Sequence, residues 1–562
     1  MSRCPREAPL GIAAGTALRL AMDGGTGPSA NVMSARFRTD FGAALDRVAA
    51  RRLAGWQVFL LGMLVALPFA LSVGLNNYFL FDEDQHIAAG VLFAREGLVP
   101  YRDFPYFHLP YLIYAYGFLF KFTDHYLLAA RLFSAVCASI TGGAIFHAAW
   151  RLFETYSVGR RLLIGGGAVV LLISTPLFFY TAGHAWNQEP STLFALLAFL
   201  CVFSAMRRPA AGARLVLGGA LLGIAIGSRV TMAPLFLPFA LTIGYAGEST
   251  RQRQRNIVLF GSGVALAMLP AAWAFAIAPR GFIFGNMEFP RVNIDYLLAS
   301  AQPHTMTVTQ KLRFFLKWFF SGANWVLFYG FFAAWLASRL RQPAPIGSSA
   351  RLLSFLFLTL PFLLLGAFAP SPFAKQYFYP LVPFLVLGIL GFLAGVPIHL
   401  RRLRWMWAAA ATLVAISAIR SGSQYEPCLR LFRPQTWYVS SLRADASRLR
   451  GLAPAGRILT LTPTYPLEAG LQMYPEFVTG AFAMRVSPFV ARERRSALRL
   501  LDSDDLDARL ADDPPAAILV GLRRSWEKPF VRYAESHGYR RTPFLKDQEL
   551  WLAPGNDPPP AP

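Results

Sequence analysis

Long apolar stretches recur along this chain from Trp56 to Ala418, and they constrain its fold more than any other feature. A helix that crosses a bilayer needs about 20 mostly apolar residues. Hydrophobic residues make up 55% of the 562 residues and charged residues only 15%, whereas soluble globular chains carry about 25% charged residues. The pattern excludes a soluble enzyme, a disordered protein and a fibrous one. It predicts a polytopic α-helical membrane protein.

About eleven segments are predicted to span the membrane. They are 56–75, 126–150, 162–182, 190–206, 214–228, 230–246, 256–278, 314–337, 351–369, 377–397 and 405–419. The segment 109–121 is also apolar, but it is only about 15 residues long and rich in Tyr and Phe, which favours a helix lying at the membrane surface.

The distribution of basic residues predicts the orientation of the chain. The formal net charge is +23, but Arg and Lys fall in short clusters between the apolar runs and form no nucleic-acid-binding patch. With the N-terminus in the cytoplasm, every loop on the inner face is basic. We therefore expect a multi-pass protein of the bacterial inner membrane, with membrane lipids around it and no nucleic-acid partner.

Composition also divides the chain. After about residue 420 charged residues become common and the apolar runs shorten. The runs at 458–461 and 517–520 predict buried strands, 539–552 predicts a hairpin, and 502–510 predicts a short acidic helix. The predicted parts are a disordered cytoplasmic tail (1–50), a membrane module (51–420) with an outer loop (76–125), a small α/β domain on the periplasmic face (421–552) and a disordered Pro-rich end (553–562).

The outer loop concentrates titratable side chains next to the first span. Carboxylates at a membrane surface are costly unless they are solvated, paired or bound to a metal. One interpretation is a general base together with ligands for a divalent cation. The alternative is a solvated acidic loop beside lipid headgroups. The residues concerned are Asp82, Glu83, Asp84, His86, Asp103 and His108.

Four further positions are predicted to face the same side. Glu189 opens a span, where capping by the helix dipole is an alternative explanation. Arg229 lies between two apolar spans, where an Arg usually meets an anion or forms a structural salt bridge. Lys375 and Tyr377 lie in an outer turn whose aromatic residues could also serve as membrane anchors. Carboxylates and separate cations together suit an anionic leaving group and a hydroxyl that must lose its proton.

The order of these motifs resembles a known family. In sequence they are Phe81-Asp82-Glu83-Asp84, Ala88-Ala89-Gly90, Gly97, Pro100, Phe107-His108-Leu109-Pro110, Ala130-Arg131, Glu189-Pro190, Arg229 and Lys375 to Pro380. The series resembles the glycosyltransferase C superfamily, specifically the bacterial relatives of protein O-mannosyltransferases and of the lipid A aminoarabinose transferase (family 39-like). The resemblance covers residues 56–400.

This resemblance implies transfer of a hexosyl or pentosyl unit from a polyprenyl-phosphate donor to a hydroxyl of an envelope glycan, lipid or protein at the periplasmic face, without a nucleotide. Asp82 would be the general base of an inverting displacement. The implied sets are Asp82 and Glu83 for catalysis, Arg229, Lys375 and Tyr377 for the donor phosphate, and Asp84, His86, Asp103, His108 and Glu189 for shaping the site or contacting the acceptor.

The need for a metal stays open, with Glu83, His108 and Glu189 as the candidate ligands of a divalent cation. His108 and Glu189 both depart from the residue that is usual in the family. Two other functions also remain alternatives, a lipid or sugar transporter (a flippase) and a non-catalytic envelope scaffold. A transporter usually carries ionisable residues at mid-membrane and repeated halves, and neither is evident in this sequence.

Overall fold

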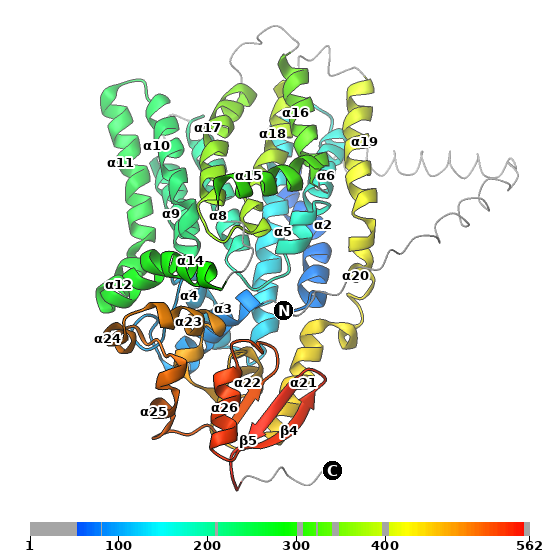
Figure 1. Ribbon diagram of the computed structural model, residues 1–562. Coiled ribbons are helices and arrows are strands. Elements are labelled where there is room, and N and C mark those ends of the chain that lie inside the picture. Colours follow the sequence, from blue (N-terminus) through cyan, green and yellow to red (C-terminus); the bar gives the residue numbers. More distant parts are fainter. Residues whose placement is uncertain are drawn as a thin grey trace, which may run out of the picture.

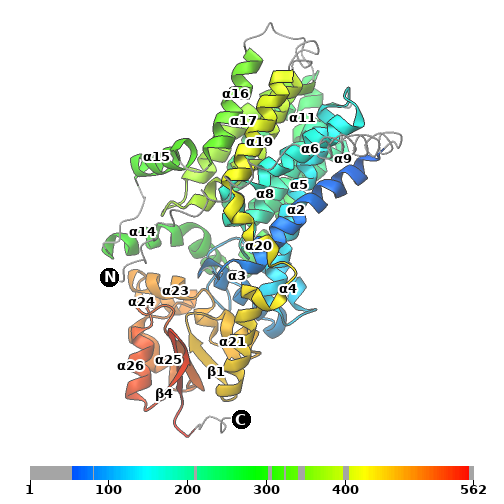
Figure 2. The ribbon, with the colours of Figure 1, turned by 90° about the vertical axis from the view of Figure 1, so that its right-hand side faces the viewer.

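A long helical bundle and a small α/β domain make up the computed structural model of the chain (Figure 1). The described residues are 53–79, 81–207, 212–300, 307–321, 324–339, 348–395 and 404–555. The predicted tail at 1–50 and residues 556–562 lie outside them. The α/β domain is attached to one end of the bundle, and helices α3 (Phe81–Val91) and α4 (Tyr111–Phe120) lie between the two parts in both views (Figures 1 and 2).

The remaining helices of residues 53–420 follow in chain order. They are α2 (Gly55–Asn76), α5 (Tyr126–Leu152), α6 (Val158–Ile173), α7 (Pro176–Thr181), α8 (Gln188–Ala205), α9 (Gly212–Ser228), α10 (Phe236–Tyr245), α11 (Thr250–Ala267), α12 (Leu269–Ile277), α13 (Pro279–Ile283), α14 (Phe289–Ala299), α15 (Val308–Leu316), α16 (Trp325–Arg339), α17 (Ser348–Phe368), α18 (Leu381–Gly395) and α19 (Arg404–Arg420).

The bundle confirms a polytopic helical membrane protein. Within the described ranges, five helices are long and apolar enough to cross a bilayer: α2, α5, α8, most of α17, and Lys375–Gly395, which includes α18. A sixth candidate consists of α11 and α12, which are bent by 47°. Shorter apolar helices occupy the predicted spans 214–228, 230–246 and 405–419. The total of eleven spans stays a prediction.

Three predicted spans are wrong as single helices. The segment 256–278 is divided at Met268 into α11 and α12. The segment 162–182 is divided into α6 and α7, because Pro176 has no N–H to continue the ladder and the side chain of Thr175 caps the new helix at the backbone N–H of Phe178. The segment 314–337 is divided because α15 ends at Leu316 and a π-helical turn follows at Lys317–Ser321. The next residues include Gly322 and Asn324, which are poor helix formers.

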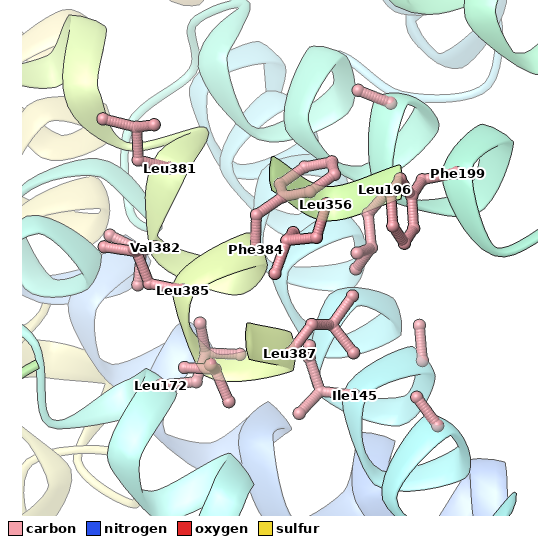
Figure 3. Packing of buried hydrophobic residues seen from close by; sticks show 14 of the residues in the cluster. Ile145, Leu172, Leu196, Phe199, Leu356, Leu381, Val382, Phe384, Leu385 and Leu387 are labelled. Carbon is pink, nitrogen blue, oxygen red and sulfur yellow. The ribbon is translucent and has the colours of Figure 1, made fainter. Parts of the chain in front are cut away.

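Helix α18 runs through the middle of the bundle and is buried on almost every side. Figure 3 shows its side chains against those of α5, α6, α8 and α17. The ring of Phe199 stacks on Phe355 with 4.2 Å between centroids and meets Phe384 edge-on at 5.4 Å. In a membrane such close packing, rather than release of water, holds helices together. It also fixes the turn before α18, which carries Lys375 and Tyr377.

Helices α9 and α11 approach each other closely through glycines. A Cβ atom at Gly219 would lie 1.9 Å from the carbonyl oxygen of Phe260, and one at Gly263 would lie 2.0 Å from that of Val216. Small residues at such positions let two membrane helices make backbone contact. This contact fixes the end of α9 and therefore the position of Arg229, the next residue along the chain.

The C-terminal domain is built on a five-stranded sheet in the order β2-β1-β3-β5-β4. Strand β1 is parallel to β2 and β3, whereas β5 is antiparallel to β3 and β4. The predicted strands and the hairpin are confirmed, since the strands are β1 (Arg457–Thr460), β2 (Gln472–Met473), β3 (Ala517–Val520), β4 (Arg540–Leu545) and β5 (Gln548–Leu552). Every residue of β3 is buried, as expected of a central strand.

Helices surround this sheet and join it to the bundle. They are α20 (Glu426–Leu429), α21 (Tyr438–Leu452), α22 (Thr464–Glu468), α23 (Ala481–Val486), α24 (Arg492–Arg495), α25 (Leu506–Leu510) and α26 (Lys528–Ser536). A short 3₁₀ turn at Ser503–Asp505 and α25 together form the predicted acidic helix. Glu468 accepts a hydrogen bond from the backbone N–H of Leu127 at 2.6 Å and forms an ion pair with Arg443 at 2.9 Å. Arg443 also pairs with Asp124 at 3.1 Å.

Candidate active site

Three consecutive carboxylates occupy the first turn of α3, where the helix dipole favours negative charge. This turn follows the end of α2 and contacts α22 of the C-terminal domain. Asp82, Glu83 and Asp84 point from successive positions of the helix, about 100° apart. Three neighbours in sequence therefore enter three different environments.

Glu83 is completely buried in a network of donors. Arg131, also completely buried, donates to both carboxylate oxygens at 2.9 and 2.8 Å. Nδ1 of His184 lies 2.9 Å from Oε1, and the backbone N–H of Ala185 donates to Oε2 at 2.8 Å. Burial alone would raise the pKa of Glu83, but these charges and hydrogen bonds hold it well below its usual range. Glu83 is a permanent anion that joins α3, α5 and the turn before α8.

Asp84 points to the C-terminal domain. Its Oδ1 accepts hydrogen bonds from the hydroxyl and the backbone N–H of Thr464, at 2.8 and 3.2 Å. Its buried Oδ2 has no partner among the described residues. Burial raises the pKa of Asp84 to about 7, against the opposing charge of Arg523 and the bonds from Thr464. The side chain joins α3 to α22 rather than facing an open site.

Asp82 is half-buried and differs from both neighbours. Among the described residues, no hydrogen bond or close ion pair engages its carboxylate. Burial raises the pKa of Asp82, and the positive charges of Arg485, Arg229 and Arg523 oppose this shift. Asp82 is thus a carboxylate without a fixed partner, surrounded by cations from the bundle and from the C-terminal domain.

The bundle contributes Arg229 and Lys375, both predicted from sequence. Arg229 lies just after α9, where it donates to Thr231 at 2.8 Å and to Asn187 at 3.2 Å, and its guanidinium lies 4.5 Å from the ring centroid of Tyr377. Nζ of Lys375 lies over the ring of Tyr180 at 3.5 Å. Neither cation pairs with a carboxylate within the described ranges. Both positive charges therefore remain available to an anion.

The C-terminal domain contributes two arginines that the sequence analysis missed. Arg485 on α23 lies 4.3 Å from the ring of Phe482, and Arg523, in the turn after β3, lies 4.5 Å from the ring of Phe81. The buried Nε atom of each has no hydrogen-bond partner among the described residues. Arg485 could have been noticed as a single charge in the apolar run 481–486, the pattern that identified Arg229. No comparable signal marks Arg523.

Two predicted histidines lie together, within electrostatic reach of Arg229. Nδ1 of His86 is 2.8 Å from the hydroxyl of Tyr106, and the rings of His86 and His108 are 5.1 Å apart. Burial lowers the pKa of His86, and it lowers that of His108 to about 4, so both rings are neutral at pH 7. Asp103 is brought to neither group, because it pairs with Arg102 at 2.7 Å and accepts the backbone N–H of Val99.

A known sequence family and several solved structures are similar to this chain. Residues 104–275 match the family described as dolichyl-phosphate-mannose-protein mannosyltransferase. The structure of ArnT from Cupriavidus metallidurans in the apo state is similar to this chain, with a TM-score of 0.54 over 88% of this chain and 97% of that one, at 14% identity. The chain has the glycosyltransferase C fold.

A second structure of ArnT is consistent with the glycosyltransferase C fold. ArnT bound to undecaprenyl phosphate gives a TM-score of 0.53 over 88% of this chain and 98% of that one, at 15% identity. The apo oligosaccharyltransferase of Archaeoglobus fulgidus is more distant, with a TM-score of 0.48 over 84% and 70% of the two chains, at 12% identity. No curated protein sequence matches this chain.

The three candidate metal ligands of this chain are not arranged to bind a cation. Both oxygens of Glu83 are taken by Arg131, His184 and Ala185. Glu189 is buried and accepts a hydrogen bond from Tyr379 at 3.1 Å. In the part of the chain that the structure describes, no three His, Cys, Asp or Glu residues are grouped as metal ligands. Glu83, His108 and Glu189 therefore do not assemble a site, and a metal requirement stays a prediction.

A cavity of about 780 Å³ lies elsewhere, between α6, α18 and α19. Its lining is mostly aliphatic and includes Leu163, Val386 and Leu413, with Arg160 and Trp407 among its few other side chains. None of the predicted site residues lines it. The polar chemistry of this fold is therefore concentrated around Asp82, between the bundle and the C-terminal domain.

Proposed function

We propose that this protein transfers a sugar from a polyprenyl-phosphate donor to the hydroxyl of an envelope acceptor, with Asp82 as the general base. One observation carries the proposal. Asp82 is a carboxylate without a hydrogen-bond partner among the described residues, and burial raises its pKa while Arg229, Arg485 and Arg523 surround it. A base with a raised pKa takes a proton more readily than an ordinary carboxylate.

The donor phosphate is assigned to Arg229, Lys375 and Tyr377. Arg229 and Lys375 carry charges that no described carboxylate neutralises, and aromatic rings hold both side chains in place. Preorganised cations stabilise negative charge as it develops on a leaving phosphate. ArnT, which shares the fold, has been solved with undecaprenyl phosphate bound, and this supports a carrier of the same chemical class here.

The reaction is a direct displacement. The acceptor hydroxyl gives its proton to Asp82 while its oxygen attacks the anomeric carbon from the side opposite the phosphate. The bond from that carbon to the phosphate oxygen breaks, and the carrier phosphate leaves with the electron pair, gaining one negative charge beside Arg229 and Lys375. The new glycosidic bond has inverted configuration, and no nucleotide takes part.

The site is assigned to the periplasmic face. The basic loops of the sequence favour a cytoplasmic N-terminus, and α3 follows the first span, so Asp82 and the C-terminal domain share the opposite side (Figure 1). Acceptors on that side are glycolipids, glycans and proteins of the envelope. Glu83 supports catalysis as the buried anion that holds α3 in position.

Asp82→Asn tests this function because it keeps the size of the side chain and removes the base. In a gene deletion strain we expect one envelope glycan to lose a single sugar by mass spectrometry, and wild type to restore it. The Asn variant should restore less than about one hundredth, since general base catalysis contributes about 10²–10⁴-fold. Asp547→Asn, an exposed carboxylate paired with Arg524, is the matched control and should behave as wild type. Full restoration by Asp82→Asn at normal protein levels would refute the assignment and favour the transporter or the scaffold.

A further inference from the structure

Arg485 and Arg523 are held by aromatic rings rather than by acids. Their guanidinium groups lie 4.3 and 4.5 Å from the rings of Phe482 and Phe81. These two rings are themselves in contact, with 4.3 Å between centroids. Each arginine keeps a buried Nε without a partner, and no ion pair between described residues includes either of them. The two charges are therefore fixed in one cluster without a direct salt bridge, and Asp84 and Glu527 are the carboxylates within electrostatic reach of Arg523.

Half-buried arginines without an acidic partner are unusual in the C-terminal domain. Its other arginines commonly pair with acids, as in Arg509–Glu476 at 2.6 Å and Arg495–Asp502 at 2.8 Å. Holding a half-buried guanidinium on a ring costs desolvation free energy that no salt bridge offsets. An arrangement of this kind is typical of a site that receives an anion from outside.

The charges around Asp82 leave room for a second anion. Arg229 on the bundle side and Arg485 and Arg523 on the domain side give three positive charges that act on the single charge of Asp82. A donor phosphodiester brings one negative charge, which leaves one positive charge uncompensated. Asp84 adds only part of a charge near neutral pH, because burial raises its pKa to about 7.

The cations also come from different parts of the molecule. Arg229 follows α9 and Lys375 precedes α18, whereas Arg485 and Arg523 come from α23 and the turn after β3. Asp82 lies on α3 between them, and its pKa responds to Arg485, Arg229 and Arg523 alike. Arg485 also lies within electrostatic reach of Tyr377, the ring that Arg229 contacts. A group bound by Arg485 and Arg523 would therefore lie beside Asp82 and next to a phosphate bound by Arg229.

We infer that Arg485 and Arg523 form an acceptor site for an oxyanion, a phosphate or carboxylate located near the hydroxyl that Asp82 deprotonates. This inference rests on the proposed function and adds the class of acceptor, an anionic one. The C-terminal domain selects that acceptor, while the bundle binds the donor. Both arginines are specificity-determining residues in this role.

Binding to the purified full-length protein in detergent tests the inference, with undecaprenyl phosphate and inorganic phosphate as probes. With undecaprenyl phosphate saturating, inorganic phosphate should still raise the melting temperature of the wild type. In the double variant Arg485→Gln, Arg523→Gln this second binding should weaken about tenfold or more, as expected for loss of charged contacts. Binding of undecaprenyl phosphate should change less than about threefold.

Three variants make the result specific. Arg524→Gln removes the same charge from the neighbouring residue, which pairs with exposed Asp547, and should leave both affinities unchanged. Arg485→Lys should keep most of the phosphate binding in case the Gln variant folds poorly. Arg229→Gln should weaken binding of undecaprenyl phosphate and leave that of inorganic phosphate.

Other outcomes overturn specific statements. If phosphate fails to bind the saturated wild type, or if the double variant loses undecaprenyl phosphate as strongly as Arg229→Gln does, no separate acceptor site exists. Undecaprenyl diphosphate gives a third outcome. If it binds the wild type at least tenfold more tightly than the monophosphate, and the double variant loses this gain, the two arginines bind a second donor phosphate. A wild type that binds inorganic phosphate through Arg485 and Arg523 but does not bind undecaprenyl phosphate would refute the proposed function alone.

Discussion

At the residue scale, the first turn of α3 shows how neighbouring carboxylates receive different roles. Glu83 is enclosed by Arg131 and His184, Asp84 by Thr464, and Asp82 by cations without a direct bond. The three side chains have almost the same chemistry in water. Their different pKa directions come only from what each meets after folding.

Glu83→Gln should destabilise the fold. The substitution leaves Arg131 buried without its counterion, and breaking a buried pair costs about 3–5 kcal/mol. We expect a large fall in melting temperature and in folded yield in detergent. Glu549→Gln, which breaks the partly exposed pair with Arg541, should have almost no effect. A Glu83→Gln protein with wild-type stability but no transfer would instead show that Glu83 acts in the reaction.

Asp84 makes stability depend on pH. Its pKa is about 7 in the folded state and about 4 in an unfolded chain, so the folded state binds the proton more tightly. Stability from this group is greatest below pH 4 and is lost as the pH rises towards 7. The wild type should therefore lose stability relative to Asp84→Asn between pH 5 and pH 7, measured as a difference in melting temperature. A constant difference over this range would contradict the buried, raised pKa.

At the element scale, apolar length predicted most helices but not their breaks. Pro176 and the Thr175 cap divide one predicted span, and the turn at Lys317–Ser321 divides another. The contact between α9 and α11 is also invisible to hydropathy, because it depends on which face of each helix carries Gly219 and Gly263. Arg229 is placed by the position of α9 against α11, which hydropathy does not predict, and not by the mere presence of a helix there.

Gly219→Ala should loosen the contact between α9 and α11. Its new Cβ would lie 1.9 Å from a carbonyl oxygen of α11, so the helices must separate, at a cost of about 1–3 kcal/mol. We expect a lower melting temperature and weaker transfer, because Arg229 follows α9. Gly261→Ala lies on the same α11 in open space and should be neutral or slightly stabilising. Equal stability of the two variants would rule out the close contact.

At the scale of the whole molecule, the C-terminal domain completes the site instead of merely following the membrane part. It supplies Arg485 and Arg523 beside Asp82, and Thr464 to Asp84. Glu468 fixes this domain to α5 by accepting from Leu127 while it pairs with Arg443. The position of the domain therefore controls the charge around Asp82.

Glu468→Ala should weaken this attachment. It removes the acceptor of a buried backbone N–H and one partner of Arg443, which costs about 1–3 kcal/mol. We expect faster limited proteolysis between the bundle and the domain, together with reduced transfer. Glu549→Ala on the far hairpin should leave both unchanged. Proteolysis and transfer at wild-type rates in Glu468→Ala would show that other contacts hold the domain.

The sequence by itself determined that this chain is a polytopic helical membrane protein with a small C-terminal α/β domain, and it identified Asp82, Arg229 and Lys375 as candidates. These conclusions follow from local composition and motif order, which need no long-range contact. Only the tertiary structure decided that Glu83 is a buried structural anion, that Asp103 lies elsewhere, and that Arg485 and Arg523 join the site. Such outcomes depend on which segments, hundreds of residues apart, come together, and a side chain's charge state depends on its burial and neighbours.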